Sequence, residues 1–323
     1  MRDATIEDPT LAKGLAGVAL VHRAFGDDAR ARRAIDGALR RIPPSPSLFS
    51  GFTGIAWAAH LIVGDGEDPV EAVDYALLDR LEAWSGPYDL VEGLVGVGVY
   101  ALERLPRKAA RRMLARVVAR LDEAPPHEGE RVDLGVAHGI PAVIALLGRV
   151  VAAGVDARTT KRARSLLDAS VAWLLAHELP RGSFGRFASA VAPDMPRRPT
   201  RLAWCYGDAG IAASLLIAAR SVRRRAWKNA ATRIALAAAS RTPDDSGVED
   251  PGLCHGAFGL AHAFRRIHEA TGDVRFARAS RRWLDRALAM PMPRSPALLE
   301  GAGGAALALL GADSGWDRAL LLS

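Results

Sequence analysis

The chain contains only two cysteines, and both stand in the same local context. Cys205 and Cys254 each precede a glycine by two residues, and His255 follows the second cysteine directly. Two thiolates and one imidazole are good zinc ligands, and a set of three leaves a fourth coordination position open, as in catalytic zinc sites. A pair of small buried thiols, or a disulfide between them, is the alternative. The place of the two cysteines in the fold therefore decides their chemistry.

Three further polar residues are candidates for the same chemistry. His138 precedes a glycine as His255 does, and an imidazole titrates near neutral pH, so His138 is a candidate general acid or base. Capping a helix or bonding a carbonyl group is its alternative role. Asp89 lies just before a glycine turn and can equally be a helix N-cap. Arg201 faces either a cavity or the solvent.

These residues belong to a motif that recurs along the chain: a polar residue, a glycine, two residues, a second glycine and a short apolar stretch. Seven copies lie at residues 13–17, 50–54, 92–96, 138–142, 206–210, 255–259 and 300–304. Only the fourth copy, with Ala142, lacks the second glycine. The first glycines are 37, 42, 46, 68, 49 and 45 residues apart, which gives each copy room for two helices and two loops.

The repeat predicts an all-α fold, an α/α toroid of seven helix pairs that forms one domain over residues 1–323. Half of the residues are apolar and only 6% are aromatic, which favours closely packed helices. Amphipathic segments such as 109–121 and 275–288 are expected to be outer helices. The 68-residue step predicts an insertion over residues 181–200, whose glycines and prolines exclude a continuous helix, as a loop over the site.

A closed ring would bring the polar residue of every motif to the same end of its central funnel. These residues are Lys13, Ser50, Glu92, His138, Tyr206, His255 and Glu300. Polar side chains at seven equivalent positions are costly to bury, so we expect them to surround a wet cavity. In this register Cys205 and Cys254 occupy the same position in consecutive repeats. The fold would therefore bring them together across 49 residues of sequence.

Composition and charge exclude several other classes of protein. The net charge is +7, but only four of the 43 basic residues are lysines, and no nucleic-acid-binding motif is present. The densest basic run, residues 223–228, is expected on the solvent face of a helix, so we expect no binding of nucleic acid. The N-terminus lacks the features of a signal peptide, and no apolar run approaches the ~20 residues of a spanning helix. A cytoplasmic protein without stable membrane insertion is expected.

Together these motifs resemble the lanthionine synthetase C family, the cyclases that close thioether rings in lanthipeptides such as nisin. The most specific are Trp204-Cys205-Tyr206-Gly207, Cys254-His255-Gly256, Ala137-His138-Gly139 and Tyr88-Asp89-Leu90-Val91-Glu92-Gly93. The resemblance implies that Cys205, Cys254 and His255 hold one zinc ion, with His138, Asp89, Arg201 and Tyr206 around the reacting centre as catalytic residues. The chain departs from the family pattern at Pro141-Ala142, in its short N-terminus, and in the little room it leaves for a peptide-binding insertion between early repeats.

The resemblance implies a reaction in which cysteine thiolates of a dehydrated precursor peptide add to dehydroalanine or dehydrobutyrine. The products are lanthionine or methyllanthionine rings. The chain has no dehydratase-like segment, so a separate dehydratase is expected as a partner. Two alternatives stay open: a related enzyme that adds glutathione or another thiol to dehydroamino acids, and a non-catalytic peptide-binding scaffold stapled by zinc. A carbohydrate-active toroid would need two facing acids, for which Glu92 and Glu300 are the obvious candidates.

Overall fold

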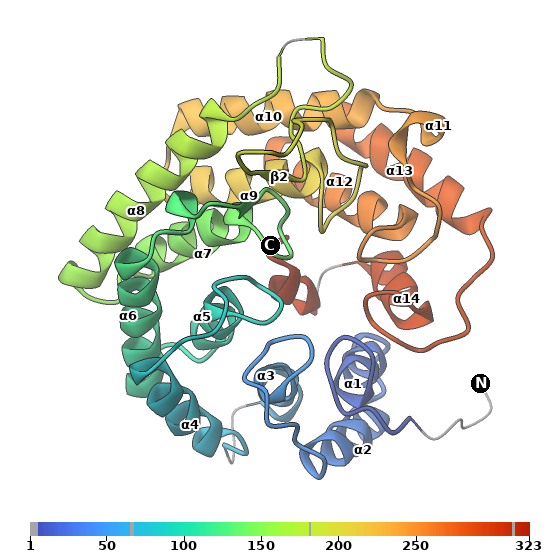
Figure 1. Ribbon diagram of the computed structural model, residues 1–323. Coiled ribbons are helices and arrows are strands. Elements are labelled where there is room, and N and C mark those ends of the chain that lie inside the picture. The colour runs from blue at the N-terminus through green and yellow to red at the C-terminus, as the bar shows by residue number, and fades with distance from the viewer. Residues whose placement is uncertain (1–5, 65–67, 181, 312–313) are drawn as a thin grey trace.

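Each of the seven glycine motifs begins a helix whose N-cap is the first glycine of the motif. The computed structural model describes residues 6–64, 68–180, 182–311 and 314–323. The helices that follow the motifs surround the centre of the molecule (Figure 1). These inner helices are α1 (Leu15–Ala24), α3 (Phe52–Val63), α5 (Leu94–Glu103), α7 (Ile140–Ala153), α9 (Asp208–Ser221), α12 (Ala257–Thr271) and α14 (Ala302–Leu310).

A second helix follows each of the first six inner helices and lies outside it in Figure 1. The outer helices are α2 (Asp28–Leu39), α4 (Glu71–Glu82), α6 (Lys108–Glu123), α8 (Ala157–Ala176), α10 (Arg225–Ser240) and α13 (Val274–Leu288). The two segments predicted to be outer helices fall on α6 and α13. In α13 the buried residues recur at helical spacing, at Phe276, Ala279, Trp283 and Ala287. Two concentric layers of helices confirm the predicted all-α toroid.

The unit that begins at the seventh motif differs from the other six. In the described part of the chain, α14 is followed by the 3-10 helix η2 (Trp316–Leu320) rather than by an outer helix. This segment turns inward, and Figure 1 shows the C-terminus at the centre of the ring. Trp316 and Leu320 are almost fully buried, and the indole N–H of Trp204 donates to the Leu320 carbonyl at 2.9 Å. The apolar residues after α14 are therefore buried by filling the centre of the ring.

Main-chain hydrogen bonds join successive repeats through one equivalent position, two residues before each first glycine. We call these seven residues the belt: Ala12, Phe49, Val91, Ala137, Cys205, Cys254 and Leu299. At six of the seven junctions the N–H of one belt residue donates to the carbonyl of the next, at 2.9 to 3.3 Å. The last of these bonds runs from Leu299 to Ala12 at 3.3 Å. The belt thus closes the ring between the seventh and first repeats, despite the short N-terminus.

Glycine is required at particular points of the repeat. A Cβ on Gly54 would lie 1.8 Å from the Leu48 carbonyl oxygen and 2.8 Å from the Cβ of Leu11, a residue of the preceding repeat. The second glycine of the motif therefore allows neighbouring repeats to approach closely. Gly207 has a φ of +147°, a backbone conformation that residues with side chains rarely adopt. The chain makes this turn immediately after Cys205 and Tyr206.

The insertion in the long fourth step is irregular over residues 182–200, as predicted, and Arg181 lies outside the described residues. Its strand β2 (Ala190–Val191) pairs antiparallel with β1 (Val132–Asp133). The strand β1 comes five residues before His138, so the insertion packs beside the segment that carries this histidine. The remaining short elements are η1 (Pro126–Glu128) and α11 (Pro243–Ser246).

The outer surface agrees with the predictions made for its charged segments. The four cationic residues of the basic run 223–228 are exposed at the start of α10. Arg224 pairs with Asp168 at 3.2 Å and stacks over the ring of Trp227. No helix within the described ranges is both long and apolar enough to cross a membrane.

Candidate active site

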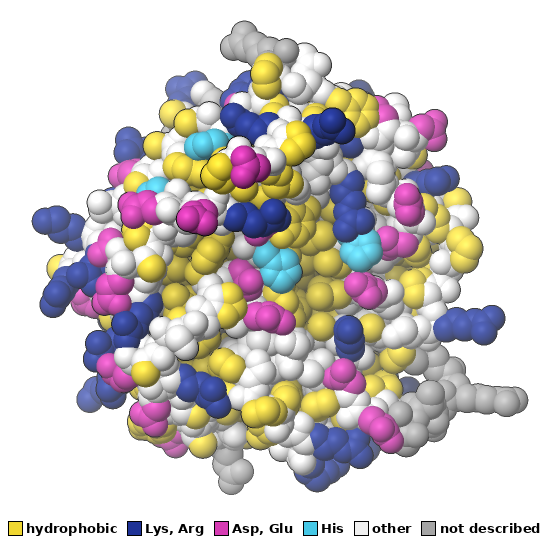
Figure 2. Space-filling view, viewed as in Figure 1, with side chains coloured by type: hydrophobic (Ala, Val, Ile, Leu, Met, Phe, Trp, Pro, Cys, Tyr) yellow, Lys and Arg dark blue, Asp and Glu magenta, His cyan; other side chains and the backbone are white. Residues whose placement is uncertain are grey.

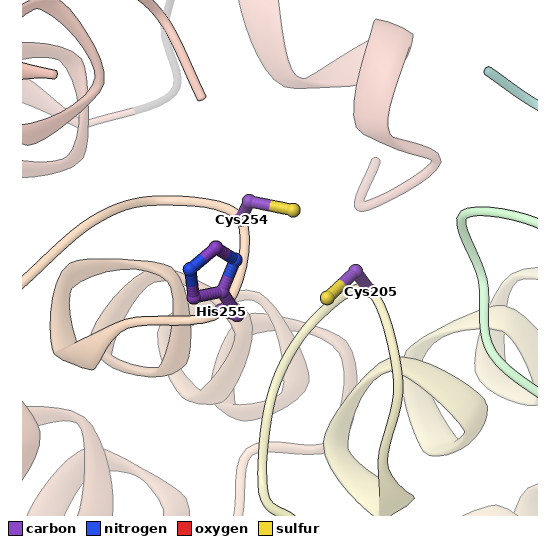
Figure 3. A group of neighbouring side chains, drawn as sticks. All are labelled: Cys205, Cys254 and His255. Atoms are coloured by element: carbon purple, nitrogen blue, oxygen red, sulfur yellow. The ribbon is translucent and has the colours of Figure 1, made fainter. Parts of the chain in front are cut away.

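The structure brings Cys205, Cys254 and His255 together at one end of the ring. One potential ligand atom from each residue lies within 4.8 Å of the others. Figure 3 shows both sulfurs and one ring nitrogen of His255 turned toward one another. Both cysteines are free thiols, Cys205 buried and Cys254 partly buried, so the disulfide alternative is not what the structure shows. Two sulfur donors and one nitrogen donor suit a zinc ion.

The belt explains why two cysteines so far apart in sequence meet. The N–H of Cys205 donates to the carbonyl of Cys254 at 3.2 Å. This bond holds the main chains of the two loops side by side. Cys205 precedes α9 and Cys254 precedes α12, two inner helices that are neighbours in the ring. The side chains then project from equivalent points of adjacent repeats. The repeat register therefore sets the separation of the two thiols.

Neighbouring groups strongly favour the charged form of one of the two thiols. A hydrogen bond from Cys254, together with His255 and the nearby Arg201, lowers the pKa of Cys205 to about 5 against the opposing effect of burial. The hydrogen bond with Cys205 and burial raise the pKa of Cys254. The hydrogen bond with Cys205 also raises the pKa of His255. The surroundings of Cys205, with Arg201 and His255 beside it, therefore favour its thiolate form, which is the form that binds metals.

His138 pairs with Asp89 across the junction between the third and fourth repeats. His138 Nδ1 lies 2.9 Å from Asp89 Oδ2, and the histidine side chain is 44% exposed. This hydrogen bond raises the pKa of His138, although partial burial opposes it. The other oxygen, Oδ1, accepts the N–H of Glu92 at 2.7 Å. Asp89 therefore holds the turn that precedes α5 and also orients His138, but it is not the N-cap of this helix, which is Gly93.

Arg201 and Tyr206 flank the cysteines. Arg201 is exposed and lies close enough to Cys205, Cys254 and His255 to affect the pKa values of all three. The Tyr206 ring centroid is 6.3 Å from that of His138. Burial and a hydrogen bond with Asp133 raise the pKa of Tyr206, so its phenol stays neutral.

The polar residues of the seven motifs all remain accessible. Tyr206 and His255 are half-buried, and the other five are exposed. Figure 2 looks onto this face and shows histidine side chains beside a central hollow with an apolar floor. The structure therefore places the candidate residues around an open mouth of the ring.

The family model of lanthionine synthetase C-like proteins matches residues 5–319, nearly the entire chain. The chain belongs to this family. Among solved structures, the lanthionine synthetase C-like fold of this chain is similar to that of a protein titled nisin cyclase, with a TM-score of 0.82 and 19% sequence identity. The similarity covers 98% of this chain and 93% of that one. No curated protein sequence matches the chain.

Two acidic residues of this lanthionine synthetase C-like site were missed by the sequence analysis. Asp133 hydrogen bonds with Tyr206, and Asp250 Oδ2 lies 3.3 Å from His255 Nε2. Both stand six residues before the first glycine of their motifs. The signal available in the sequence was the recurrence of an acidic residue six positions before the first glycine, where Asp8 stands in the first repeat as well.

Proposed function

We propose that the chain is a zinc-dependent lanthipeptide cyclase that adds cysteine thiolates of a dehydrated precursor peptide to dehydroalanine or dehydrobutyrine. The observation that carries the proposal is the cluster of Cys205, Cys254 and His255 at the mouth, beside the Asp89–His138 pair. The family and the fold shared with nisin cyclase support it. A separate dehydratase would supply the dehydrated residues. We also propose that residues 1–323 form one domain.

Cys205, Cys254 and His255 would hold the zinc ion. Within the described residues this group contains three donors, which supports an open coordination position and speaks against a closed structural staple. When bound, zinc would keep a substrate cysteine deprotonated at neutral pH. The chain's own residues then determine where the proton and the negative charge of the addition go.

Addition forms a bond between the substrate sulfur and the β-carbon, and the electron pair of the double bond moves onto the α-carbon and its carbonyl. His138 is positioned to donate the proton that the α-carbon requires, since Asp89 holds its ring and favours its protonated form. Arg201, which lies close to the cysteines, would supply a cationic group for the developing enolate oxygen. Tyr206 packs beside His138 and limits the positions of that ring.

The test combines zinc analysis with a ring-closure assay on the purified full chain. Closure leaves the peptide mass unchanged, so it is followed by the loss of thiols that can be alkylated. We expect about one equivalent of zinc in the wild type, and loss of both zinc and activity in Cys254→Ala. His138→Asn should keep zinc and close rings about 100- to 10,000-fold more slowly. Ser50→Ala, at the same motif position in a distant repeat, is the control and should change neither property.

Less than about half an equivalent of zinc, with Cys254→Ala unaffected, would refute the metal site. Addition of glutathione without ring closure would identify the related thiol-adding enzyme instead. Zinc binding without addition of any thiol would identify a scaffold.

A further inference from the structure

Asp250 uses its two carboxylate oxygens on different partners. Oδ1 accepts the N–H of Gly252 at 2.7 Å, and Oδ2 lies 3.3 Å from Nε2 of His255. The carbonyl of Asp250 also accepts the N–H of Ala257, the first residue of α12, at 3.0 Å. The residue thus forms the turn that leads into α12 and reaches the candidate metal ligand from the same position.

The equivalent residues of other repeats show which of these hydrogen bonds the turn before the inner helix requires. The equivalent residues Asp8, Ser45 and Ser295 each accept the N–H two residues further on, at 2.7, 3.3 and 3.2 Å. Their carbonyls also accept the N–H of the first inner-helix residue, as that of Asp250 does. Serine offers a single side-chain oxygen, and one oxygen is enough for the turn. The second oxygen of Asp250 is therefore free to serve His255.

The ring of His255 is oriented with one nitrogen toward Asp250 and the other toward the two cysteines. In Figure 3 one ring nitrogen points toward the sulfurs of Cys205 and Cys254, and the other points away. The nitrogen near Asp250 is Nε2, so Nδ1 is the nitrogen that faces the sulfurs. Histidines that bind metals generally donate their second ring N–H to a carboxylate or carbonyl, which fixes the orientation of the ring. The carboxylate of Asp89 is divided in the same way between a turn N–H and His138.

We propose that Asp250 is a positioning residue of the metal site: Oδ1 builds the turn before α12, and Oδ2 holds the His255 ring with Nδ1 toward the two sulfurs. The inference rests on the proposed function, because it assumes that His255 is a metal ligand. In this assignment Asp250 acts through His255 and is not itself one of the ligands, which are Cys205, Cys254 and His255.

The repeat supplies the test variant and its control. Asp250→Ser retains the oxygen that the turn needs, as Ser45 and Ser295 show, and removes the one that faces His255. Asp8→Ser makes the same exchange at the same position of the first repeat, where Lys13 takes the place of histidine. Zinc affinity of the full-length chain is measured by competition with a chromogenic chelator. Thermal unfolding is measured without zinc, so that metal binding does not alter the midpoint.

We expect Asp250→Ser to bind zinc about 10- to 100-fold more weakly than the wild type. Without zinc, the unfolding temperature of Asp250→Ser should equal that of Asp8→Ser. The Asp8→Ser control should bind zinc with the affinity of the wild type. A wild-type zinc affinity in Asp250→Ser overturns the proposal and leaves the proposed function intact. A wild-type chain that binds no zinc overturns both.

Asp250→Asn provides the same readout if the serine variant does not fold. Its amide oxygen can accept the turn N–H, while its NH₂ group would face the N–H on Nε2. Weakened zinc binding in this variant supports the proposal, and unchanged binding overturns it.

Discussion

The protonation of His138 depends chiefly on Asp89, with smaller contributions from Asp133 and Glu92. Asp89 accepts a hydrogen bond from Nδ1, and this bond is the largest cause of the raised pKa of His138. With a raised pKa, more of the imidazole carries a proton at a given pH. In the proposed function, His138 is fully protonated as the acid at low pH, and its protonated fraction declines as the pH rises through its pKa.

Asp89→Asn should therefore move the alkaline decline of ring closure to lower pH. The amide can still accept the hydrogen bond but carries no charge, so the pKa of His138 falls toward its ordinary value. The measurement is the rate of ring closure between about pH 6 and 9 at saturating zinc. Zinc content serves as the control and should equal that of the wild type. A decline at the same pH in both proteins would show that another group supplies the proton.

The repeat register predicted the principal site residues because they stand next to the glycines that define it. Cys205, Cys254 and His255 meet as this register required. Asp133 and Asp250 were missed because they stand six residues before the glycine, where the same residue types also serve as ordinary turn formers. Distinguishing the two uses requires the position of the second carboxylate oxygen, which the spacing of residues does not specify.

The insertion is anchored to the ring through Asp208, the first residue of α9. Its side chain accepts the N–H groups of Arg186 at 2.8 Å and Phe187 at 3.1 Å. Burial raises the pKa of Asp208 to about 6, despite these bonds. Since the pKa in the folded state lies above that of a free carboxyl group, the part of the stability that comes from protonating Asp208 is complete below about pH 4 and is lost as the pH rises through about 6. The two hydrogen bonds to the main chain are still accepted by the carboxylate at pH 7.

Asp208→Ala should release this anchor at pH 7. Removing the acceptor leaves two main-chain donors unsatisfied, at about 1–3 kcal/mol for each one that remains buried. We expect a lower free energy of unfolding and faster amide hydrogen exchange at Arg186 and Phe187. Asp208→Asn keeps an acceptor oxygen and should lose less. Unchanged exchange in Asp208→Ala would show that other contacts, such as the β1–β2 pairing and the Arg186–Glu178 pair, hold the insertion.

The glycines and prolines of residues 182–200 predicted irregular structure, and the structure agrees. The pairing of β1 with β2 could not be predicted. Each strand has two residues, which is too short for an alternating apolar pattern to develop. The contact also joins segments almost 60 residues apart, and only the closed fold brings them together.

A buried carboxylate at the centre of the ring, Asp317, binds the C-terminal segment to α12, beside the pair that Arg318 forms with Glu103 of α5. Asp317 in η2 is fully buried, lies 2.8 Å from His262 Nε2 and accepts hydrogen bonds from Arg266 Nε at 2.6 Å and Nη2 at 2.9 Å. These bonds hold the pKa of Asp317 well below its usual range, although burial alone would raise it. The carboxylate therefore ties the C-terminal segment to α12.

Asp317→Ala should destabilise the protein by about 3–5 kcal/mol, because it takes the carboxylate away from the partly buried Arg266 guanidinium and leaves the buried His262 ring without its hydrogen-bond partner at Nε2. The measurement is the free energy of unfolding in urea. Asp285→Ala is the matched control, since Asp285 forms an exposed pair with Arg281 and should change stability by less than about 0.5 kcal/mol. Equal effects of the two substitutions would mean that η2 is not held by this cluster.

The period of the glycine motif predicted a closed ring of helix pairs, and the toroid is confirmed. The last unit was less predictable. After α14 the apolar residues Trp316 and Leu320 to Leu322 have no helical period long enough to specify an outer helix. Whether they cover α14 or enter the ring depends on the free space at its centre, a property of the assembled fold.

The belt of main-chain hydrogen bonds holds the two thiols as a pre-organised pair of donor groups. Because Cys205 and Cys254 are joined through their own backbones, the free energy of folding already includes the entropy of bringing these two donors together. A small zinc domain, by contrast, folds only when its metal arrives. An ion entering this site would find its sulfur donors in place, so its capture and release can be uncoupled from folding.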